Sequence, residues 1–444
     1  MSGSTPANDE TRSIHVAAMA RVEGEGALHV TMRQGKVEEV RLEIYEPPRF
    51  FEALLRGRDF REVPDIVARI CGICPVAYQM SACHAIEKAL DVSGQIDPAI
   101  ITMRDLLYCG EWIESHVLHI FLLHLPDFLG YESAISMAKD HGDLVKRALQ
   151  VKKLGNEIIA LLGGRSVHPV GACIGGFYSL PETDRCRQLL PTLRTRLDEM
   201  CELTLFLARK LTFPDFDRDY EFVALQPAGE YPMNRGPIVS SRGLRIEQEQ
   251  FLQVFEEQQV PYSTALRAII KGRGAYCVGP LARLNLNAAS LHSRAAELLQ
   301  EICTIIQRDL PWRNSFLSLL ARCVETVHAL AVAGDILQNY TQPKRSRVPV
   351  EACAGTGAAA TEAPRGVLWH QYRIGADGSI VSARIVPPTS QNQYQIENDL
   401  RVLAEQIISL PDEQAQLRCE QLIRNYDPCI SCATHFLKFD RRWK

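Results

Sequence analysis

The chain has 444 residues with a net charge of −4, and 46% of the residues are hydrophobic. This composition is ordinary for a soluble globular protein with one large core or two to three domains, and the charge argues against a nucleic-acid partner. We expect no direct membrane span, because no run looks apolar over the length of a bilayer crossing. The 14 cysteines are spread irregularly and no secretory signal is apparent, which predicts a reducing compartment with thiols buried or bound to metal.

Alternating polar and apolar residues predict two small antiparallel hairpins. Residues 27–46 should form two strands joined at Gln34–Gly35. Residues 366–388 should form a second pair of strands with a turn at Ala376–Gly378. Ahead of the first hairpin, residues 1–13 are polar and are predicted to be a disordered tail.

Long stretches of helical periodicity separate the two hairpins. Apolar residues recur three and four positions apart in Asp105–His124 and in Asp140–Leu162. Residues 288–340 continue this pattern, with a break near Pro311. We therefore predict a mainly α fold, in which a long-helix bundle carries small peripheral antiparallel β-sheets.

Two Cys-x-x-Cys pairs lie far apart in the sequence. Cys71 and Cys74 occur in RICGIC, and Cys429 and Cys432 occur in YDPCISCATHF. One such pair lets two thiolates from a tight turn face the same ion, and two pairs complete a four-sulfur shell for zinc, copper(I), nickel or iron. Spacing alone leaves a structural zinc site open. A thioredoxin-like redox pair is disfavoured, because no βαβ pattern surrounds either motif.

The residues around these cysteines resemble the two signature motifs of the nickel–iron hydrogenase large subunit. The resemblance continues, in the family's order, through RVEGEG (21–26), PPRFFEALLRGRD (47–59), GGRSVHPVGACIGGF (163–177), TEAPRGVLWH (361–370) and VPPTSQN (386–392). It implies the hydrogenase large-subunit fold over residues 14–435. It also implies an active site that is buried between the N- and C-terminal cysteine motifs.

A nickel–iron centre follows from the same resemblance. Cys71, Cys74, Cys429 and Cys432 would all bind nickel, and Cys74 and Cys432 would also bridge to an iron that carries carbon monoxide and two cyanides. Four thiolates make nickel electron-rich, and dihydrogen would be split heterolytically with a nearby base taking the proton. The remaining cysteines carry no such spacing and are interpreted as core thiols.

Further residues match the family's positions around the centre. Glu23 matches its proton-relay glutamate, for which the simpler alternative is a solvated residue before a strand. Arg365 matches an arginine poised over the open metal position, where its fixed donors can orient ligands, and Asp427 matches the carboxylate near it. The backbone around Pro364 and the hydroxyl of Thr389 would hydrogen-bond the cyanides, which would otherwise be costly to bury.

A buried magnesium site is implied as well. Glu52 would supply a carboxylate, His435 an imidazole and Ile385 a backbone carbonyl. The resemblance further implies that residues 436–444 are a maturation tail, which an endopeptidase removes between His435 and Phe436 after nickel-insertion factors have acted. The simpler alternative is that the tail stays in place along the surface.

Two positions depart from many relatives. Tyr78 stands where they have histidine, and Ser115 stands where oxygen-exposed membrane-bound enzymes carry aspartate. Both positions are more similar to the cytoplasmic, NAD(P)-linked bidirectional branch, which includes sulfhydrogenase alpha subunits. Several nearby histidines could mimic a metal site but are interpreted as structural: His116, His119, His124 and His168.

The resemblance therefore implies a cytoplasmic enzyme that oxidises dihydrogen reversibly. The chain has no further multi-cysteine cluster motif and no Gly-x-Gly-x-x-Gly loop, so we expect iron–sulfur clusters on a small subunit, and flavin and NAD(P) on diaphorase subunits. The alternatives are a hydrogen sensor, a subunit of a different electron-accepting complex, a quinone-site scaffold and a zinc-stapled interaction protein. The intact cysteines argue against the scaffold, and metal analysis would identify the zinc protein.

Overall fold

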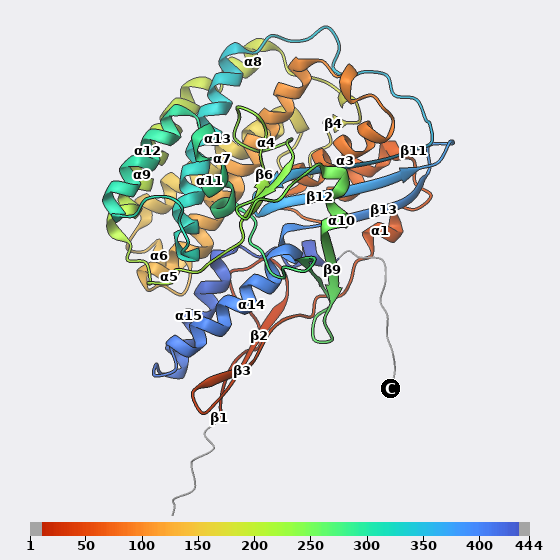
Figure 1. Ribbon diagram of the computed structural model, residues 1–444. Helices are drawn as coiled ribbons and strands as arrows, with labels where there is room; N and C mark the ends of the chain where they lie inside the picture. Colours follow the sequence, from red (N-terminus) through yellow and green to blue (C-terminus); the bar gives the residue numbers. More distant parts are fainter. Residues whose placement is uncertain (1–10, 435–444) are drawn as a thin grey trace, which may run out of the picture.

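A group of long helices forms one part of the molecule, and small antiparallel sheets with the helices α3 (Pro75–Ala89), α14 (Pro388–Gln406) and α15 (Asp412–Asn425) beside them form the rest (Figure 1). The structure, a computed structural model, describes residues 11–434. The other longer helices are α4 (Pro98–Val117), α7 (Gly142–Gly163), α9 (Leu190–Lys210), α12 (Ser293–Ile306) and α13 (Ser318–Asn339). The shorter helices are α1 (Phe51–Leu54), α2 (Val63–Val67), α5 (Leu125–Leu129), α6 (Ala134–Met137), α8 (Thr183–Arg187), α10 (Phe251–Val254) and α11 (Pro280–Asn287).

The sheets are small, and neighbouring strands in them run antiparallel. One sheet has the order β1 (Thr11–Val16), β2 (Gly26–Arg33), β3 (Lys36–Ile44). Another has the order β11 (Gly355–Ala363), β12 (Gly366–Ile374), β13 (Ile380–Val386), and a third the order β6 (Val223–Leu225), β7 (Ile238–Ser240), β8 (Arg245–Ile246). Two isolated pairs are β4 (Ala172–Cys173) with β5 (Gly176–Phe177), and β9 (Phe255–Gln259) with β10 (Leu266–Ile270).

Both predicted hairpins are confirmed. In the first, Arg33 pairs with Lys36, and the turn consists of Gln34 (φ 51°) and Gly35 (φ 79°). A positive φ at both central positions is what a two-residue turn needs to match the twist of its strands. The second hairpin is β12–β13, whose turn contains the predicted residues 376–378.

The predicted helices are confirmed, with changes at their ends. Helix α4 starts at Pro98, ahead of the predicted start, and its continuation Leu118–His124 is π-helical. Helix α7 matches the predicted Asp140–Leu162 within two residues at each end. Residues 288–340 divide into α12 and α13, and the break includes Pro311.

Strands β1 and β11 were not predicted. Strand β1 includes residues 11–13, which the sequence analysis placed in the N-terminal tail; the rest of that tail lies outside the described residues. Strand β11 has few β-branched residues, so its propensity gave no signal. Its glycines instead allow helix α3 to pack directly on the strand, because a Cβ at Gly355 would come within 1.9 Å of the Ala89 carbonyl oxygen.

The reason given for expecting no membrane span, that no run is apolar over the length of a bilayer crossing, was wrong. Residues Ser315–Asn339 form a stretch that is long and apolar enough to cross a bilayer, with a mean hydropathy of 1.5. In the fold, however, 94% of this window is buried. Helix α13 lies between α4 and α9 in the helical part of the molecule (Figure 1). The stretch is therefore the core helix of this fold.

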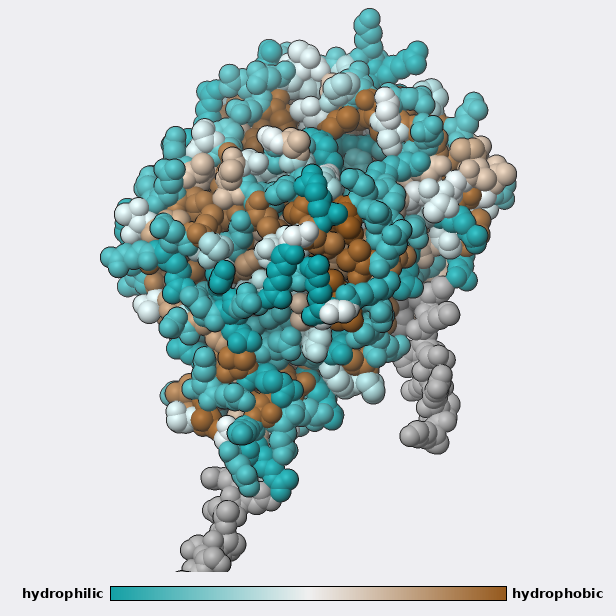
Figure 2. All heavy atoms as spheres, in the orientation of Figure 1, coloured by the Kyte–Doolittle hydropathy of each residue, from teal (hydrophilic) through white to brown (hydrophobic). Residues whose placement is uncertain are grey.

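Hydrophobic packing continues from the helices into the region of the cysteine motifs. The main core cluster contains buried side chains of β2, β3, α3, α4 and α13, and all four motif cysteines belong to it. Figure 2 shows hydrophilic residues over most of the face in view, with hydrophobic residues visible between them near its middle. The site that the cysteines form is thus enclosed by the core.

Candidate metal centre

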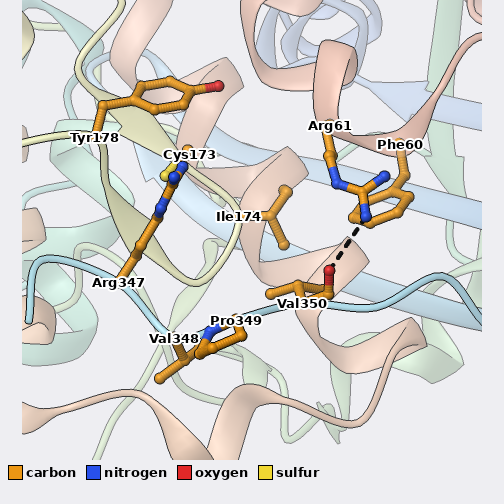
Figure 3. A pocket seen from close by; sticks show the side chains of 9 residues that line it. All are labelled: Phe60, Arg61, Cys173, Ile174, Tyr178, Arg347, Val348, Pro349 and Val350. Atoms are coloured by element: carbon orange, nitrogen blue, oxygen red, sulfur yellow. Dashed lines mark hydrogen bonds between the residues drawn. The ribbon is translucent and has the colours of Figure 1, made fainter.

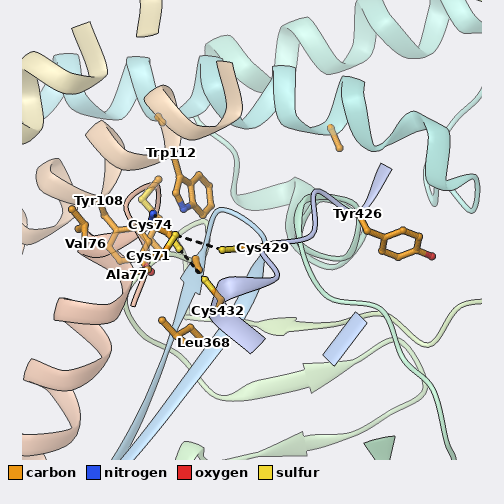
Figure 4. Close-up of a cluster of buried hydrophobic side chains, with 14 of the residues drawn as sticks. Cys71, Cys74, Val76, Ala77, Tyr108, Trp112, Leu368, Tyr426, Cys429 and Cys432 are labelled. Atoms are coloured by element: carbon orange, nitrogen blue, oxygen red, sulfur yellow. Dashed lines mark hydrogen bonds between the residues drawn. The ribbon is translucent and has the colours of Figure 1, made fainter. Parts of the chain in front are cut away.

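Four cysteines from the two halves of the chain meet in the core (Figure 4). The Sγ atoms of Cys71 and Cys429 are 3.5 Å apart, and those of Cys74 and Cys432 are 3.8 Å apart. All four Sγ atoms lie within 4.8 Å of one another, and all four residues are buried. Convergent thiolates of this kind bind soft metal ions. The pairing also places the first cysteine of one motif against the first of the other, and the second against the second.

The N-terminal pair lies where helix α3 begins. Cys74 directly precedes this helix, and the backbone N–H groups of Ile73 and Cys74 donate to Cys71 Sγ at 3.3 and 3.4 Å. A helix N-terminus and backbone donors both favour the thiolate form of cysteine. The local backbone therefore prepares this pair for a cation.

Glu111 binds the start of the same helix, a contact that the sequence did not predict. Its carboxylate comes from α4 and accepts the N–H groups of Val76 at 2.6 Å and Ala77 at 3.0 Å. These are two of the first-turn donors that a helix cannot satisfy by itself. Burial raises the pKa of Glu111 well above its usual range. No spacing in the sequence links Glu111 to the cysteine motif, so only the structure reveals the contact.

The C-terminal pair follows helix α15 and is fixed by residues from elsewhere in the chain. The N–H of Cys429 donates to Thr389 Oγ1 at 3.0 Å, and the N–H of Ile430 donates to the carbonyl oxygen of Glu23 at 2.9 Å. The segment turns at Asp427, whose φ is 51°. Thr389 therefore accepts a hydrogen bond from the cysteine segment and keeps its own hydroxyl proton for another acceptor.

Arg49 ties the two cysteine segments together. Its Nη2 donates to the carbonyl oxygen of Ile70 at 2.7 Å and also to the carbonyl oxygen of Ser431. Its backbone N–H donates to the carbonyl oxygen of Thr434 at 2.7 Å. One guanidinium thus connects the residue before Cys71 with the residue before Cys432. Arg49 lies in the motif PPRFFEALLRGRD, but the sequence did not predict that it connects the two cysteine segments.

Glu23 lies in contact with the cysteine cluster. Cys429 Sγ donates to Glu23 Oε2 at 3.0 Å, and the N–H of Ser431 donates to the same oxygen at 3.1 Å. The solvated alternative is thereby disfavoured, because the carboxylate faces a buried thiol. A carboxylate at this distance can take a proton from the thiol.

Arg365 occupies the turn between β11 and β12, next to Pro364. It is buried, and it donates from Nε to the carbonyl oxygen of Asp427 at 2.7 Å and from Nη2 to Asp427 Oδ1 at 3.1 Å. The structure thus brings the predicted pair together. Within residues 11–434, Arg365 Nη1 has no hydrogen-bond partner. A buried donor without a partner is costly, so this nitrogen fits a site that receives an acceptor.

Glu52 forms a second buried polar site, on helix α1. Its Oε1 accepts the N–H of Ile385 at 2.8 Å, whereas Oε2 is buried without a partner in the described part of the chain. Burial raises the pKa of Glu52 to about 8. This carboxylate would be stabilised by a cation. Ile385 is adjacent as predicted, although the observed contact uses its N–H. His435 and Phe436 lie outside the described residues.

The unassigned residues near the centre are buried as well. Burial raises the pKa of Tyr78 well above its usual range. Ser115 Oγ has no hydrogen-bond partner among residues 11–434. The interpretation of His116, on α4, and His119, in its π-helical continuation, as packed residues agrees with the structure: His116 Nε2 lies 3.0 Å from Glu325 Oε2, and His119 Nε2 lies 2.7 Å from the carbonyl oxygen of Arg424.

The thiols differ in their affinity for protons. Hydrogen bonding from Cys429 lowers the pKa of Cys71 well below its usual range, while burial raises the pKa of Cys429 well above it. The protein alone therefore favours one thiolate among protonated neighbours. Binding a cation to all four thiolates would displace the remaining protons.

A cavity of about 480 Å³ lies apart from the cysteine cluster. Figure 3 shows its lining, which includes Arg61, Cys173, Tyr178 and Arg347. None of the four clustered cysteines contributes to the lining. The four-cysteine site therefore does not line this cavity.

Comparisons with known proteins agree with the geometry. Residues 49–146 and 251–435 match the family described as nickel-dependent hydrogenase. The chain is 35% identical to sulfhydrogenase 2 subunit alpha of Pyrococcus furiosus, covering 96% of this chain and 99% of the relative. It is 27% identical to the beta subunit of the NAD-reducing hydrogenase HoxS of Cupriavidus necator, covering 96% and 95%.

Solved structures show the same fold. A crystal structure of an NAD+-reducing nickel–iron hydrogenase in its dihydrogen-reduced state superposes with a TM-score of 0.82 at 26% identity, covering 96% of this chain and 99% of that one. A nickel–iron–selenium hydrogenase of D. vulgaris Hildenborough superposes with a TM-score of 0.78 at 24% identity, covering 96% and 100%. The similarity extends over the whole length of these chains.

Proposed function

This chain belongs to the nickel-dependent hydrogenase large-subunit family, and we propose that it is the catalytic subunit of an enzyme that reversibly oxidises dihydrogen to protons and electrons. The observation that carries the proposal is the buried cluster of four Sγ atoms within 4.8 Å, with a carboxylate in contact. A zinc-stapled protein would need the four sulfurs but not the carboxylate, nor the buried Arg365 beside them.

The residues present fit a nickel–iron centre. Cys71, Cys74, Cys429 and Cys432 would hold nickel, and Cys74 and Cys432, whose Sγ atoms are 3.8 Å apart, would also hold iron. When bound, with carbon monoxide and cyanides on iron, this centre supplies the place where dihydrogen is split heterolytically. The hydroxyl of Thr389, the unpartnered Nη1 of Arg365 and the backbone near Pro364 would meet the ligands of the iron.

Glu23 would move the proton. Its Oε2 lies 3.0 Å from Cys429 Sγ, so a proton on that sulfur can pass directly to the carboxylate. The N–H of Ser431 keeps the carboxylate in place during the transfer. Arg365, fixed by Asp427, would orient what binds at the open side of the centre.

Magnesium would occupy the second buried site. Glu52 Oε2 would be one ligand, because this oxygen has no hydrogen-bond partner in the described part of the chain. The carbonyl group of Ile385, on the adjacent strand β13, would be another. His435 would complete the set, directly after the last described residue. A hard cation prefers such oxygen ligands and would keep Glu52 ionised despite its burial.

Maturation would act on the chain directly after these ligands. Since residues 11–13 belong to strand β1, we propose that the hydrogenase domain begins at residue 11 and ends at residue 435, and that an endopeptidase removes 436–444 after nickel-insertion factors have loaded the site. Cys429 and Cys432 are buried, and their segment contacts Glu23, Thr389 and Arg49. Intact mass spectrometry of active enzyme tests this proposal: a chain that still ends at Lys444 in nickel-loaded protein would refute it.

Electrons would leave beside Gly72. Gly72, between two buried cysteines, is exposed. His168 Nε2 lies close to it, and His168 Nδ1 contacts the carbonyl oxygen of Ala68 at 2.7 Å. The flanking Val167 and Val170 are exposed apolar residues. We propose that an iron–sulfur small subunit covers this area, since the chain has no further multi-cysteine motif for a cluster of its own.

The electron acceptor would be NAD(P), reached through flavin-containing diaphorase subunits of a cytoplasmic complex. The likeness to an NAD-reducing hydrogenase in both sequence and fold supports this assignment. The alternatives of a hydrogen sensor or another acceptor complex predict dihydrogen cleavage without nicotinamide reduction.

The deciding experiment is purification of the native complex under anaerobic conditions. We expect nickel with iron in excess of it, because partner clusters add iron, together with infrared bands of carbon monoxide and cyanide and dihydrogen-dependent reduction of NAD or NADP. Zinc alone in an active native preparation would refute the hydrogenase assignment. Dihydrogen oxidation that reduces dyes but neither nicotinamide would keep the hydrogenase and refute the NAD(P) link.

A further inference from the structure

Arg283 is a fully buried arginine that contacts the turn carrying Arg365. It lies on helix α11, and its Nη1 donates to the carbonyl oxygen of Ala363 at 2.9 Å. Its Nη2 donates to the carbonyl oxygen of Pro364 at 3.0 Å. Arg283 therefore binds the two carbonyl groups that directly precede Arg365 in the chain.

Two carboxylates fix the same guanidinium. Glu325 accepts from Nε and from Nη2, both at 2.7 Å, and Glu362 accepts from Nη1 at 3.0 Å. The guanidinium also stacks over Trp112, with 4.4 Å to the ring centroid. All these groups are buried, so the paired charges and the planar donors allow little movement.

The carboxylates are themselves held from outside. Glu325 accepts the hydroxyl of Tyr231 at 2.8 Å and lies 3.0 Å from His116 Nε2. Glu362 Oε1 accepts the N–H of Leu225 at 2.7 Å. Contacts from α4, α13, β6 and the segment that contains Tyr231 thus hold Arg283 in place directly or through the two carboxylates. Arg283 in turn holds one short turn in place.

The backbone ahead of α11 packs on the same turn. A Cβ at Gly279 would come within 2.8 Å of the Arg365 carbonyl oxygen, and the N–H of Arg283 donates to the Gly279 carbonyl oxygen at 2.9 Å. The start of α11 therefore touches Arg365 through its backbone as well as through the Arg283 side chain. These two contacts are independent of the Asp427 contact that fixes the Arg365 side chain.

We propose that Arg283 is a positioning residue, which sets where Arg365 enters the metal centre. The inference rests on the proposed function, because Arg365 matters only if the four cysteines hold the reacting metals. A lysine at this position keeps the charge, but its single nitrogen cannot satisfy two carboxylates and two carbonyl groups at once. The turn should then relax, and Arg365 should shift relative to the cysteines.

The test compares Arg283→Lys with Arg104→Lys in the whole complex. Arg104 is a matched control, because it is also buried and also pairs with a carboxylate, Glu87, at 2.9 and 2.6 Å. It contacts the carbonyl oxygen of Cys173 and not the Arg365 turn. Arg283→Lys loses more buried contacts than Arg104→Lys, so the comparison uses the infrared bands and kcat, which report on the metal centre, and not thermal stability.

For Arg283→Lys we expect wild-type nickel content, displaced cyanide infrared bands and a kcat lowered by about tenfold or more with little change in KM. Arg104→Lys should retain the wild-type bands and kcat. If Arg283→Lys matches Arg104→Lys in bands and in kcat, the positioning role is wrong. If the wild-type complex shows no such bands, the proposed function fails instead.

A metal-free measurement keeps the proposal testable without activity. Amide hydrogen exchange at Arg365 and Gly366 should be faster in metal-free Arg283→Lys than in metal-free Arg104→Lys. If Arg283→Lys does not fold, Glu362→Gln serves, because it removes one anchoring charge and leaves Glu325 in place. Glu362→Gln should show the same faster exchange to a smaller degree, and unchanged exchange in the variant that folds would overturn the proposal.

Discussion

The Sγ atom of Cys429 donates a hydrogen bond to Glu23 Oε2 at 3.0 Å. The backbones of the two residues form a parallel bridge, and the N–H of Ile430 reaches the Glu23 carbonyl oxygen. The Glu23 carboxylate is therefore held in place by the backbone contacts of Glu23 as well as by its own hydrogen bonds. A substitution that keeps the side-chain length can remove the proton chemistry while leaving this placement intact.

Glu23→Gln should separate assembly from turnover. Glutamine can still accept the N–H of Ser431, but it cannot carry the proton. We expect wild-type nickel and iron, with dihydrogen oxidation and hydrogen–deuterium exchange lowered by about 100-fold or more. Glu25→Gln is the control, because Glu25 is exposed two residues away. Wild-type turnover in Glu23→Gln would assign the proton exit to another group.

Cys74→Ser and Cys432→Ser should abolish retention of the metals. Each thiolate is proposed to contact both nickel and iron, and serine supplies a harder, poorly ionised ligand. Metal analysis of this subunit, separated from its iron–sulfur partner, should show that both nickel and iron are lost relative to wild type. Cys83→Ser is the control, since Cys83 is buried in helix α3 outside the cluster. Full metal content in either cluster variant would show that the bridging assignment is wrong.

Glu52→Gln should change how stability depends on pH. Burial raises the pKa of Glu52 from 4.5 to about 8 in the folded protein. The metal-free fold therefore holds this proton more tightly than the unfolded chain does. Its free energy of unfolding should fall by roughly 5 kcal/mol as the pH rises through this interval, and the variant should lack that fall.

Magnesium should oppose this fall in the free energy of unfolding at high pH, because it binds the ionised form of the Glu52 carboxylate. Urea unfolding of metal-free protein at pH 5 and pH 8, with and without magnesium, measures both effects. Wild type should gain more from magnesium at the higher pH, and Glu52→Gln should gain little at either. The exposed Glu62→Gln is the control. An equal response to magnesium in wild type and Glu52→Gln would move the cation site elsewhere.

Arg365→Lys should retain the metals and slow the reaction. An ammonium group cannot reproduce the planar fork that contacts Asp427 with two nitrogens and leaves Nη1 available. We expect kcat lowered on the order of 100-fold with normal nickel content. Asp427→Asn keeps the backbone acceptor of Arg365 and should have a smaller effect. An unchanged rate in Arg365→Lys would remove this residue from the mechanism.

The parts of the site that could be predicted are those where chemistry depends on a local pattern. The Cys-x-x-Cys spacing sets which sulfurs face one ion, and the surrounding motifs located Glu23, Glu52 and the Arg365–Asp427 pair. The structure brings Glu23, Arg365 and Asp427 to the cysteine cluster. It also places Glu52 beside Ile385, but through the N–H of Ile385 and not through the predicted carbonyl group. The roles of these residues stay predictions until the variants are measured.

The supporting residues could not be predicted, because their partners are backbone groups far away in the sequence. Glu111 binds the N–H groups of a helix start, Arg49 binds two distant carbonyl groups, and Arg283 binds a turn on another element. None of these contacts leaves a spacing in the sequence. Strand β11 was missed for a related reason, since its glycines serve the packing of α3 rather than strand propensity.

The 3.5 Å contact between Cys71 and Cys429 joins residues 358 positions apart. A metal ion bound to both would therefore act as a cross-link that closes a very long loop. In the chain-entropy description of cross-links, a loop of this length lowers the entropy of the unfolded state by the equivalent of about 6 kcal/mol. Loading the centre should consequently hold the chain's two distant cysteine segments together, and removing the metal should loosen the C-terminal segment before the helical core.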